Sequence, residues 1–540
     1  MDALRGADIL ARTLEAAGVG RVFTLSGNHI MPVFDALLDT GIEVVHARHE
    51  AACVHMADAH GRLTGETGVA LVTGGQGYTN GAAALYTALA AESPVLLLSG
   101  HAGLNELGRG GFQELAQADV ARPMTKASWT ATGAAALGLD AARALRLARE
   151  GRPGPVHLSL PVDVLEARVP AGSATIPGPA AMRIAAAEPD PALVAAVLGA
   201  IAQAARPLVL CGPALCDAPG RAAMAAFEGR AGVPVVGMES PRGLNDPSLG
   251  AFAQVVARAD LIVLAGKPLD FTLKFGAAPA LAPDCRLVIV DPDPALLARA
   301  APERLVASGL AWPRALLAAL AAAAPARASQ DWHRAVRAAL AYHPPGWERA
   351  GGGDRRLHPV ELCRAVDGFL RDHPGGTLVC DGGEIGQWPQ ALVRADRRLI
   401  NGVSGTIGAS IPFAIAAKAL RPDEPAVAVL GDGTFGFHMA EFDTALRYGL
   451  PIVAVVGNDA RWNAEHQIQL RDYGSSRTRH CDLLPTRYDR VVEALGGFGR
   501  LVTAAADLPD ALAAAHASGL PACINVMIES VPAPMIRMPA

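Results

Sequence analysis

The chain is expected to fold as three α/β domains, each a parallel β-sheet flanked by helices. Short β-rich apolar runs alternate with Ala/Leu-rich helical stretches three times along its 540 residues, and this alternation is typical of parallel sheets with crossover helices. The length agrees with about three domains at roughly 100–200 residues each. Hydrophobic residues make up 51% of the chain and charged residues 18%, a composition that excludes a disordered protein.

Apolar β-rich runs bounded by turn residues predict the strands, and helical periodicity predicts the helices between them. In the first third the expected strands cover residues 21–25, 42–47, 68–73, 94–100 and 155–161, with helices over 1–19, 29–40 and 50–65. In the middle third the expected strands cover 207–212, 234–238, 261–266 and 286–291. In the last third they cover 376–383, 426–433, 451–459 and 522–528.

Two tracts without periodicity separate the three repeats and are predicted to be linkers. They run from Ala167 to Pro189 and from Ala323 to Arg355. The expected domains are residues 1–170, 186–325 and 355–540. In open parallel sheets ligands bind at the carboxyl ends of the strands, so the residues that directly follow each strand are the candidate site residues.

Composition also excludes several classes of partner and compartment. The net charge is −5 and no basic tract is present, so nucleic acid is not an expected partner. The eight cysteines form no C-x-x-C pair, which favours a reducing cytoplasm over a disulfide framework or a zinc site. No apolar run reaches the roughly 18–20 residues of a membrane span, and the N-terminus reads as an amphipathic helix, not a signal peptide. We expect a cytoplasmic protein without a membrane partner.

Two acidic residues follow neighbouring strands in the last third. The run Gly431-Asp432-Gly433-Thr434 follows the strand at 426–430, and the next strand ends in Asn458-Asp459. Carboxylate oxygens of this kind suit Mg²⁺, which completes its shell with phosphate oxygens and water. Glycines allow main-chain N–H groups to approach a diphosphate. The alternative is a pair of ordinary strand-to-helix turns.

This arrangement, with Asp459 twenty-seven positions after Asp432, resembles the cofactor motif of thiamine-diphosphate-dependent enzymes. The resemblance implies thiamine diphosphate and Mg²⁺, with the metal held by Asp432, Asp459 and the main chain of Arg461. The family's usual second Asn is replaced by Asp459, which still offers an oxygen ligand and adds negative charge beside the diphosphate.

A glutamate far upstream fits the same family. Arg48-His49-Glu50-Ala51-Ala52 follows the strand at 42–47 and resembles the family's pyrimidine-domain signature. The resemblance implies that Glu50 hydrogen-bonds N1′ of the aminopyrimidine and so activates the cofactor. Taken alone, a Glu in a first helical turn is explained by the helix macrodipole.

Glycine-rich turns elsewhere extend the resemblance to all three domains, although each taken alone reads as an ordinary loop. In the segment 401–408 the resemblance implies that the carbonyl of Gly405 receives the 4′-amino group and that Ile407 holds the cofactor bent. The turn 381–384 is the implied second diphosphate contact. The full implied set of cofactor contacts is Thr73, Asn80, Gly383, Glu384, Gly405, Ile407, Gly431, Asp432, Gly433, Thr434 and Asp459.

Within the family the chain is most similar to the branch of acetolactate synthase, benzaldehyde lyase and 2-hydroxyacyl-CoA lyase. The domain order, the RHEAA run and the segments 267–276 and 521–532 carry this similarity. It implies that His29 handles the proton of a substrate hydroxyl and that Gln113 faces the substrate. The polar segment 461–467 predicts a polar or charged substrate if it lines the pocket.

The activity implied is that of a carboligase or lyase that makes or breaks a C–C bond next to a carbonyl. The substrate would be a 2-oxo acid, an aldehyde or a 2-hydroxy ketone. The resemblance also implies a homodimer or homotetramer with active sites at the subunit interface. The alternatives are a 2-hydroxyacyl-CoA lyase, an oxalyl-CoA-type decarboxylase and a non-catalytic scaffold, and the sequence leaves open whether the central domain binds FAD or ADP.

Overall fold

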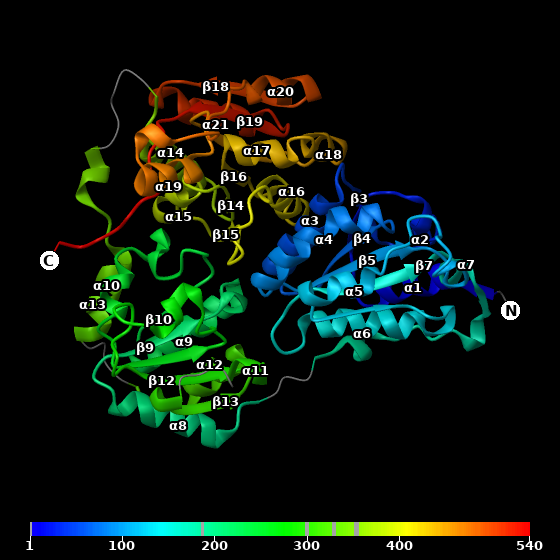
Figure 1. The fold of residues 1–540 in the computed structure, drawn as a ribbon, viewed down its shortest axis with the longest axis horizontal. Helices are drawn as coiled ribbons and strands as arrows, with labels where there is room; N and C mark the ends of the chain where they lie inside the picture. Colours follow the sequence, from blue (N-terminus) through cyan, green and yellow to red (C-terminus); the bar gives the residue numbers. More distant parts are fainter. Residues whose placement is uncertain (1–2, 185–187, 298–301, 327–330, 350–355, 540) are drawn as a thin grey trace. The chain divides into compact units, whose positions relative to one another are not determined.

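A computed structural model describes residues 3–184, 188–297, 302–326, 331–349 and 356–539. These residues form three large parallel sheets flanked by helices (Figure 1), so the predicted fold class is confirmed. The chain divides into two compact units. Unit 1 comprises Met1–Ala185, Ile411–Arg421 and His438–Leu450, and unit 2 comprises Ala186–Ser410, Pro422–Phe437 and Pro451–Ala540.

Unit 1 contains a six-stranded parallel sheet of order β3-β2-β4-β5-β7-β6. Its strands are β2 (Arg21–Thr24), β3 (Glu43–His46), β4 (Gly68–Val72), β5 (Val95–His101), β6 (Ala127–Thr130) and β7 (Val156–Pro161), and β1 (Ala3–Arg5) pairs antiparallel with β8 (Arg168–Pro170). Its helices are α1 (Gly6–Ala16), α2 (Met31–Leu37), α3 (Glu50–Thr64), α4 (Gln76–Ala90), α5 (Gln117–Ala121), α6 (Leu137–Arg149), α7 (Val162–Glu166) and α18 (Glu441–Arg447), with nearly all of α16 (Ser410–Leu420).

Unit 2 begins with a five-stranded parallel sheet of order β10-β9-β11-β12-β13. Its strands are β9 (Pro207–Cys211), β10 (Val235–Gly237), β11 (Leu261–Ala265), β12 (Arg286–Asp291) and β13 (Leu305–Leu310). Its helices are α8 (Pro191–Gln203), α9 (Ala218–Ala231), α10 (Phe252–Val256), α11 (Pro294–Leu297), α12 (Pro313–Ala323) and α13 (Asp331–Ala341).

The third sheet, also in unit 2, has the order β15-β14-β16-β17-β19-β18. Its strands are β14 (Thr377–Cys380), β15 (Arg397–Ile400), β16 (Ala426–Gly431), β17 (Val453–Asn458), β18 (Phe498–Val502) and β19 (Ala522–Met527). Its helices are α14 (Pro359–Asp372), α15 (Gln387–Leu392), α17 (Asp432–His438), α19 (Asn463–Tyr473), α20 (Tyr488–Leu495) and α21 (Leu508–Ala517). Gly431 pairs with Gly457, so β16 and β17 end side by side.

The region from Ala323 to Arg355, expected to be a linker, contains helix α13. Its side chains Trp332, Val336 and Ala339 are buried in the core beside the first sheet of unit 2, and the indole N–H of Trp332 donates to the carbonyl of Pro207 at 2.8 Å. This part of the linker prediction is therefore wrong. The helix was missed because only one face of it is apolar and the surrounding sequence is rich in Ala and Pro.

Across the part of the chain that the structure describes, every helix is too short or too polar to cross a lipid bilayer.

Candidate active site

Helix α3 begins with Glu50 at the carboxyl end of the unit 1 sheet. The Glu50 side chain is 9% exposed, and the side-chain amide of Asn80 donates to its Oε2 at 3.0 Å. Gly77 makes room for this group: a Cβ there would lie 2.7 Å from Cγ2 of Thr73 and 3.3 Å from Oε1 of Glu50. Glu50, Thr73 and Asn80 are therefore gathered around one turn of α4.

The turn that presents Glu50 is held from both sides. Nδ1 of His49 accepts from the main-chain N–H of Ala51 at 3.1 Å and so caps α3. The main-chain N–H of Arg48 donates to both carboxylate oxygens of Glu441 in α18, each at 3.1 Å. Glu441 is buried, so this contact fixes the backbone two residues before the helix begins.

His29 lies buried in the short 3₁₀ turn η1 (Asn28–Ile30) that follows β2. Its Nε2 is 3.2 Å from the carbonyl oxygen of Phe112, and its Nδ1 is 3.2 Å from Oγ1 of Thr73. A carbonyl only accepts, so the neutral ring carries its proton on Nε2 and accepts from the Thr73 hydroxyl at Nδ1. Burial lowers the pKa of His29, which favours this neutral form.

Gln113 lies next to Phe112, with a positive φ of 56°. It packs so closely on Gly75 that a Cβ at Gly75 would lie 2.6 Å from Cβ of Gln113. The Phe112 ring stacks on His29 with ring centres 5.7 Å apart. The five residues predicted for this half of the site, His29, Glu50, Thr73, Asn80 and Gln113, are thus connected by direct contacts or through one intervening residue.

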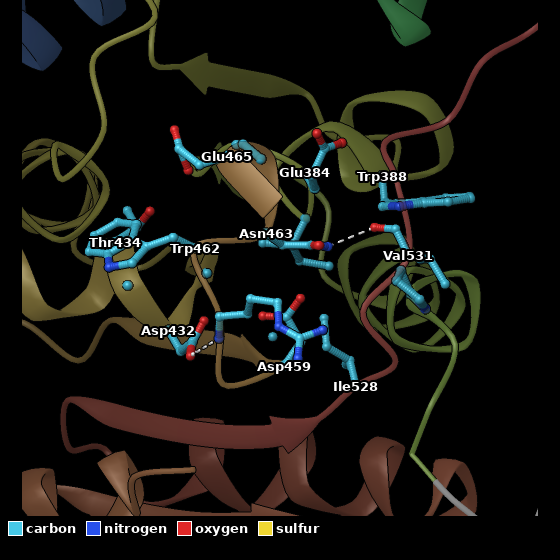
Figure 2. A pocket seen from close by; sticks show the side chains of 18 of the residues that line it. Glu384, Trp388, Asp432, Thr434, Asp459, Trp462, Asn463, Glu465, Ile528 and Val531 are labelled. Carbon is cyan, nitrogen blue, oxygen red and sulfur yellow. Dashed lines mark hydrogen bonds between the residues drawn. The ribbon is translucent and has the colours of Figure 1, made fainter. Parts of the chain in front are cut away.

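Unit 2 contains an open pocket with about 540 Å³ of empty space (Figure 2). Asp432 and Asp459 line it from the ends of β16 and β17 and are only 2% and 7% exposed. The main-chain N–H of Arg461 donates to Oδ2 of Asp432 at 3.2 Å, the dashed line at Asp432 in Figure 2. The two carboxylates that the sequence placed on neighbouring strands are therefore brought into one pocket.

Burial disfavours the negative charge of both groups, and the charge of Asp432 further disfavours that of Asp459. Burial raises the pKa of Asp432 to about 6. Burial, followed by the charge of Asp432, raises the pKa of Asp459 to about 7. A divalent cation between them would offset both effects. Among the described residues no three His, Cys, Asp or Glu side chains converge into a complete metal cage, so such a cation would take further oxygens from elsewhere.

Two glycine turns that line this pocket allow neighbouring residues to pack closely against their main chain. A Cβ at Gly433 would meet the ring of Trp462 at 2.7 Å, and a Cβ at Gly383 would meet Cβ of Ala464 at 2.4 Å. The start of α19 therefore lies directly against both glycine turns. Two carboxylates for a cation and glycine turns for phosphate oxygens fit a cofactor that carries a diphosphate.

The remaining predicted contacts divide between this pocket and its surroundings. The residues of the predicted set that line the pocket are Gly383, Glu384, Ile407, Gly431, Asp432, Gly433, Thr434, Asp459 and Arg461. Gly405 lies outside the lining, with Pro241 of the same unit 3.7 Å from where its Cβ would be. The polar segment reaches the pocket with Arg461–Glu465, and Asn463 donates from Nδ2 to the carbonyl of Val531 at 2.8 Å (Figure 2).

Two buried residues shape the pocket but were not singled out as site residues, although Asp381 lies in the predicted contact turn 381–384. Oδ2 of Asp381 accepts from the main-chain N–H groups of Gly408 and Ser410, each at 3.0 Å, and ties the segment of Ile407 to the turn after β14. Oδ1 of Asn458 accepts from the N–H of Ala460 at 3.1 Å and shapes the turn that carries Asp459. In the sequence, Asp381 stands in the turn 381–384 and Asn458 directly before Asp459, but nothing local indicates the hydrogen bonds that each one makes.

Comparisons with known proteins agree with this chemistry. Residues 4–120 match the thiamine pyrophosphate enzyme N-terminal TPP binding domain, and residues 381–526 match the C-terminal TPP binding domain. A probable acetolactate synthase of Mycobacterium bovis is 32% identical, over 96% of this chain and 95% of the relative. Human 2-hydroxyacyl-CoA lyase 2 is 31% identical, over 92% of this chain and 85% of the relative. The catabolic acetolactate synthase of Raoultella terrigena is 30% identical, over 97% of this chain and 95% of the relative. The chain therefore belongs to the thiamine pyrophosphate enzymes and, with relatives of these two kinds along almost its whole length, is a thiamine-diphosphate-dependent enzyme of the acetolactate synthase and 2-hydroxyacyl-CoA lyase branch.

Proposed function

We propose that this enzyme is a carboligase or lyase acting on a 2-oxo acid, an aldehyde or a 2-hydroxy ketone. The observation that carries the proposal is the pair of buried carboxylates, Asp432 and Asp459, in a pocket floored by glycine turns. Asp432, Asp459 and the main chain of Arg461 would hold Mg²⁺. Gly383 and the run 431–434 would contact the diphosphate. Bound there, thiamine diphosphate supplies a nucleophilic carbon that attacks carbonyl groups.

Glu50 is proposed as the residue that activates the cofactor. Its Oε2 already accepts from Asn80, which leaves Oε1 to exchange a proton with the aminopyrimidine ring. Burial strengthens such a hydrogen bond because the local dielectric is low. Asn80 is therefore proposed to orient the carboxylate, and Thr73 to shape its surroundings beside Gly77.

His29 and Gln113 are proposed to act on the substrate. A neutral His29 can release the proton on Nε2 or accept one at Nδ1, and both atoms now have weak neutral partners in Phe112 and Thr73. Proton transfer by a positioned imidazole contributes roughly 10²–10⁴-fold to rate. The amide of Gln113 offers both a donor and an acceptor for a carbonyl or hydroxyl group.

The polarity of the pocket supports a polar or charged substrate. Arg461, Asn463 and Glu465 all line it; the guanidinium of Arg461 pairs with Asp482 at 2.9 Å and the amide of Asn463 donates to Val531, so a ligand would share these groups with their protein partners. A 2-oxo acid carries a carboxylate that a guanidinium recognises, which favours this class over a purely aromatic aldehyde.

A 2-hydroxyacyl-CoA lyase is the second candidate, because human 2-hydroxyacyl-CoA lyase 2 is nearly as similar as the synthases. For either activity we propose a cytoplasmic homodimer or homotetramer with active sites at the subunit interface. Light scattering on the purified enzyme tests the assembly, and a monomeric active enzyme would contradict it.

The activity is tested by calorimetry and product analysis. Thiamine diphosphate is titrated into the protein with Mg²⁺ and with a chelator, and the loaded enzyme is assayed by mass spectrometry on pyruvate, benzaldehyde, benzoin, formaldehyde and a 2-hydroxyacyl-CoA. Glu50→Gln is expected to bind the cofactor but to lose about 10²–10⁴-fold in turnover, whereas Glu66→Gln, at an exposed glutamate, should behave as wild type. No cofactor binding would favour the non-catalytic scaffold, and normal turnover by Glu50→Gln would refute the assigned role.

A further inference from the structure

Gln117, the first residue of α5, is a buried amide whose polar atoms all have partners. It is 1% exposed. Its Oε1 accepts from the main-chain N–H of Gly75 at 2.6 Å. Its Nε2 is within donating distance of the carbonyl of Gly100 at 3.0 Å, and of the hydroxyls of Ser99 and Ser159, both at 2.9 Å. A buried amide with this many partners has a fixed orientation.

Oε1 of Gln117 holds the turn at Gly75, against which Gln113 packs and from which α4 begins. Gly75 is the N-cap of α4, the helix that carries Asn80, the partner of Glu50. Gly75 has a φ of 56°, and Gln113 packs directly on its Cα. A shift of Gly75 would therefore move Gln113 and the start of α4 together.

The donor side of Gln117 holds the strand end on which His29 rests. Gly100 lies in β5, and a Cβ at Gly100 would lie 2.5 Å from Cβ of His29. A Cβ at Gly74 would in turn lie 2.7 Å from the Gly100 carbonyl oxygen, the atom to which Gln117 donates. One carboxamide thus connects the supports of His29 and of Gln113.

The hydrogen-bond network of Gln117 continues away from His29 and Gln113 and ends at Ser128, which can serve as a control position. Oγ of Ser99 is 2.7 Å from Nε2 of His157, and Nδ1 of His157 is 2.8 Å from Oγ of Ser128. Ser128 belongs to the same network but lies at its far end, in the edge strand β6. Its removal disturbs the network without touching Gly75 or Gly100.

We propose that Gln117 is a positioning residue for the reaction: by holding Gly75 and Gly100 it sets the places of Gln113 and His29 relative to Glu50. This inference rests on the roles proposed for those three residues. Gln117 itself touches neither substrate nor cofactor, because its side chain is enclosed by main-chain and serine groups.

Gln117→Leu removes every one of these hydrogen bonds at similar side-chain size. We expect kcat/KM for the substrate that the wild type turns over to fall about 100-fold, because a displacement of about 1 Å has that effect on a catalytic arrangement. Thiamine diphosphate affinity is expected to fall less than kcat/KM does, since the proposed diphosphate and metal contacts lie in unit 2 and only Thr73 and Asn80 of the cofactor contacts adjoin the displaced turn. Hydrogen–deuterium exchange of the cofactor-free protein should become faster in residues 73–80 and 111–114.

Gln117→Glu keeps the acceptor for Gly75 but donates only when its carboxyl is protonated. Burial beside the Gly100 carbonyl raises the pKa of the introduced carboxyl above its ordinary value of about 4.3. The protonated form, and with it the bond to Gly100, becomes more populated as the pH falls. The ratio of variant to wild-type kcat/KM should therefore rise between about pH 8 and about pH 6.

The outcomes are distinguishable. Ser128→Ala should lower the melting temperature while leaving kcat and KM within about twofold. A folded Gln117→Leu with wild-type kcat/KM, or an equal loss of kcat/KM in Ser128→Ala, would overturn the proposal. If Gln117→Leu does not fold, the proposal is tested by the ratio of Gln117→Glu to wild-type kcat/KM. A ratio that does not change with pH would overturn the proposal. A wild type that binds no thiamine diphosphate and converts no substrate would instead refute the proposed function, while the exchange experiment would still test the positioning.

Discussion

The two groups of site residues differ in charge, and this difference determines what each can bind. Asp432 and Asp459 are carboxylates buried together, and burial with the neighbouring charge raises the pKa of Asp459 to about 7. Around Glu50 the partners are neutral: the Asn80 amide donates to it, and burial lowers the pKa of the nearby His29. The first arrangement suits a cation, and the second suits proton transfer within a small set of polar groups.

Substitution of Asp459 separates the need for an oxygen ligand from the need for a charge. Asp459→Asn keeps an oxygen at the same place, so thiamine diphosphate affinity in excess Mg²⁺ is expected to stay within about tenfold of wild type. Asp459→Leu has similar bulk without an oxygen and should lose about 100-fold or more. Calorimetry with and without Mg²⁺ measures both. Equal affinities for the Asn and Leu variants would show that Asp459 is not a metal ligand.

The residues proposed to bind the metal or transfer protons lie in short motifs and could be predicted from the sequence. The residues that hold those groups in place could not. Glu50, Asp432 and Asp459 each lie within four residues of the end of a strand, in a run that resembles a family signature. Asp381 and Gln117 act through hydrogen bonds to segments between 17 and 42 positions away. Such contacts depend on strand order and register, which no local pattern in a single sequence encodes.

At the scale of elements, the central strands of the three large sheets were predicted, whereas four of their six edge strands were missed. The missed strands of the three large sheets are β6, β13, β15 and β18, and each lies at a sheet edge. Central parallel strands are covered on both faces and read as continuous apolar runs. An edge strand such as β13, with alternating partly buried and exposed residues, lacks that signal. The predicted domain limits at 170, 186, 325 and 355 stay predictions.

The close contact between α17 and the start of α19 predicts how a methyl group would affect the pocket. Gly433→Ala places a Cβ 2.7 Å from the Trp462 ring, so the segment 461–465 must move, at a cost of about 1–3 kcal/mol. We expect lower thiamine diphosphate affinity and a lower melting temperature. Gly436→Ala is the matched control in the same helix, because a Cβ there meets nothing within 4 Å, and it should leave affinity unchanged. Equal losses of cofactor affinity in both variants would show that any added methyl group in α17 has this effect, and that the contact with Trp462 is not its cause.

At the scale of the whole molecule, buried titratable groups make the stability of the protein depend on pH in two opposing ways. Burial lowers the pKa of His55, His157 and His438 in unit 1 to about 3, with further lowering of His55 by Arg62 and of His438 by His55. In unit 2, burial raises the pKa of Asp381 to about 6. As the pH falls, a histidine with a lowered pKa decreases the free energy of unfolding, because the unfolded chain binds the proton more readily. A carboxyl with a raised pKa increases the free energy of unfolding over the same change, because the folded chain binds the proton more readily.

His438→Gln isolates one of these contributions from all the others. Above about pH 6.5 the histidine is neutral in both states, and below it the unfolded chain binds a proton that the folded chain excludes until about pH 3. The stability of the wild type relative to the variant should therefore fall by up to about 1.4 kcal/mol for each pH unit below about 6.5, and stay constant above it. Urea unfolding of both proteins across this range measures the difference directly, because every group common to the two cancels. A difference that does not change between about pH 7 and about pH 5 would mean that His438 is protonated to the same extent in the folded and the unfolded chain, and that its burial against His49 and His55 does not exclude the proton.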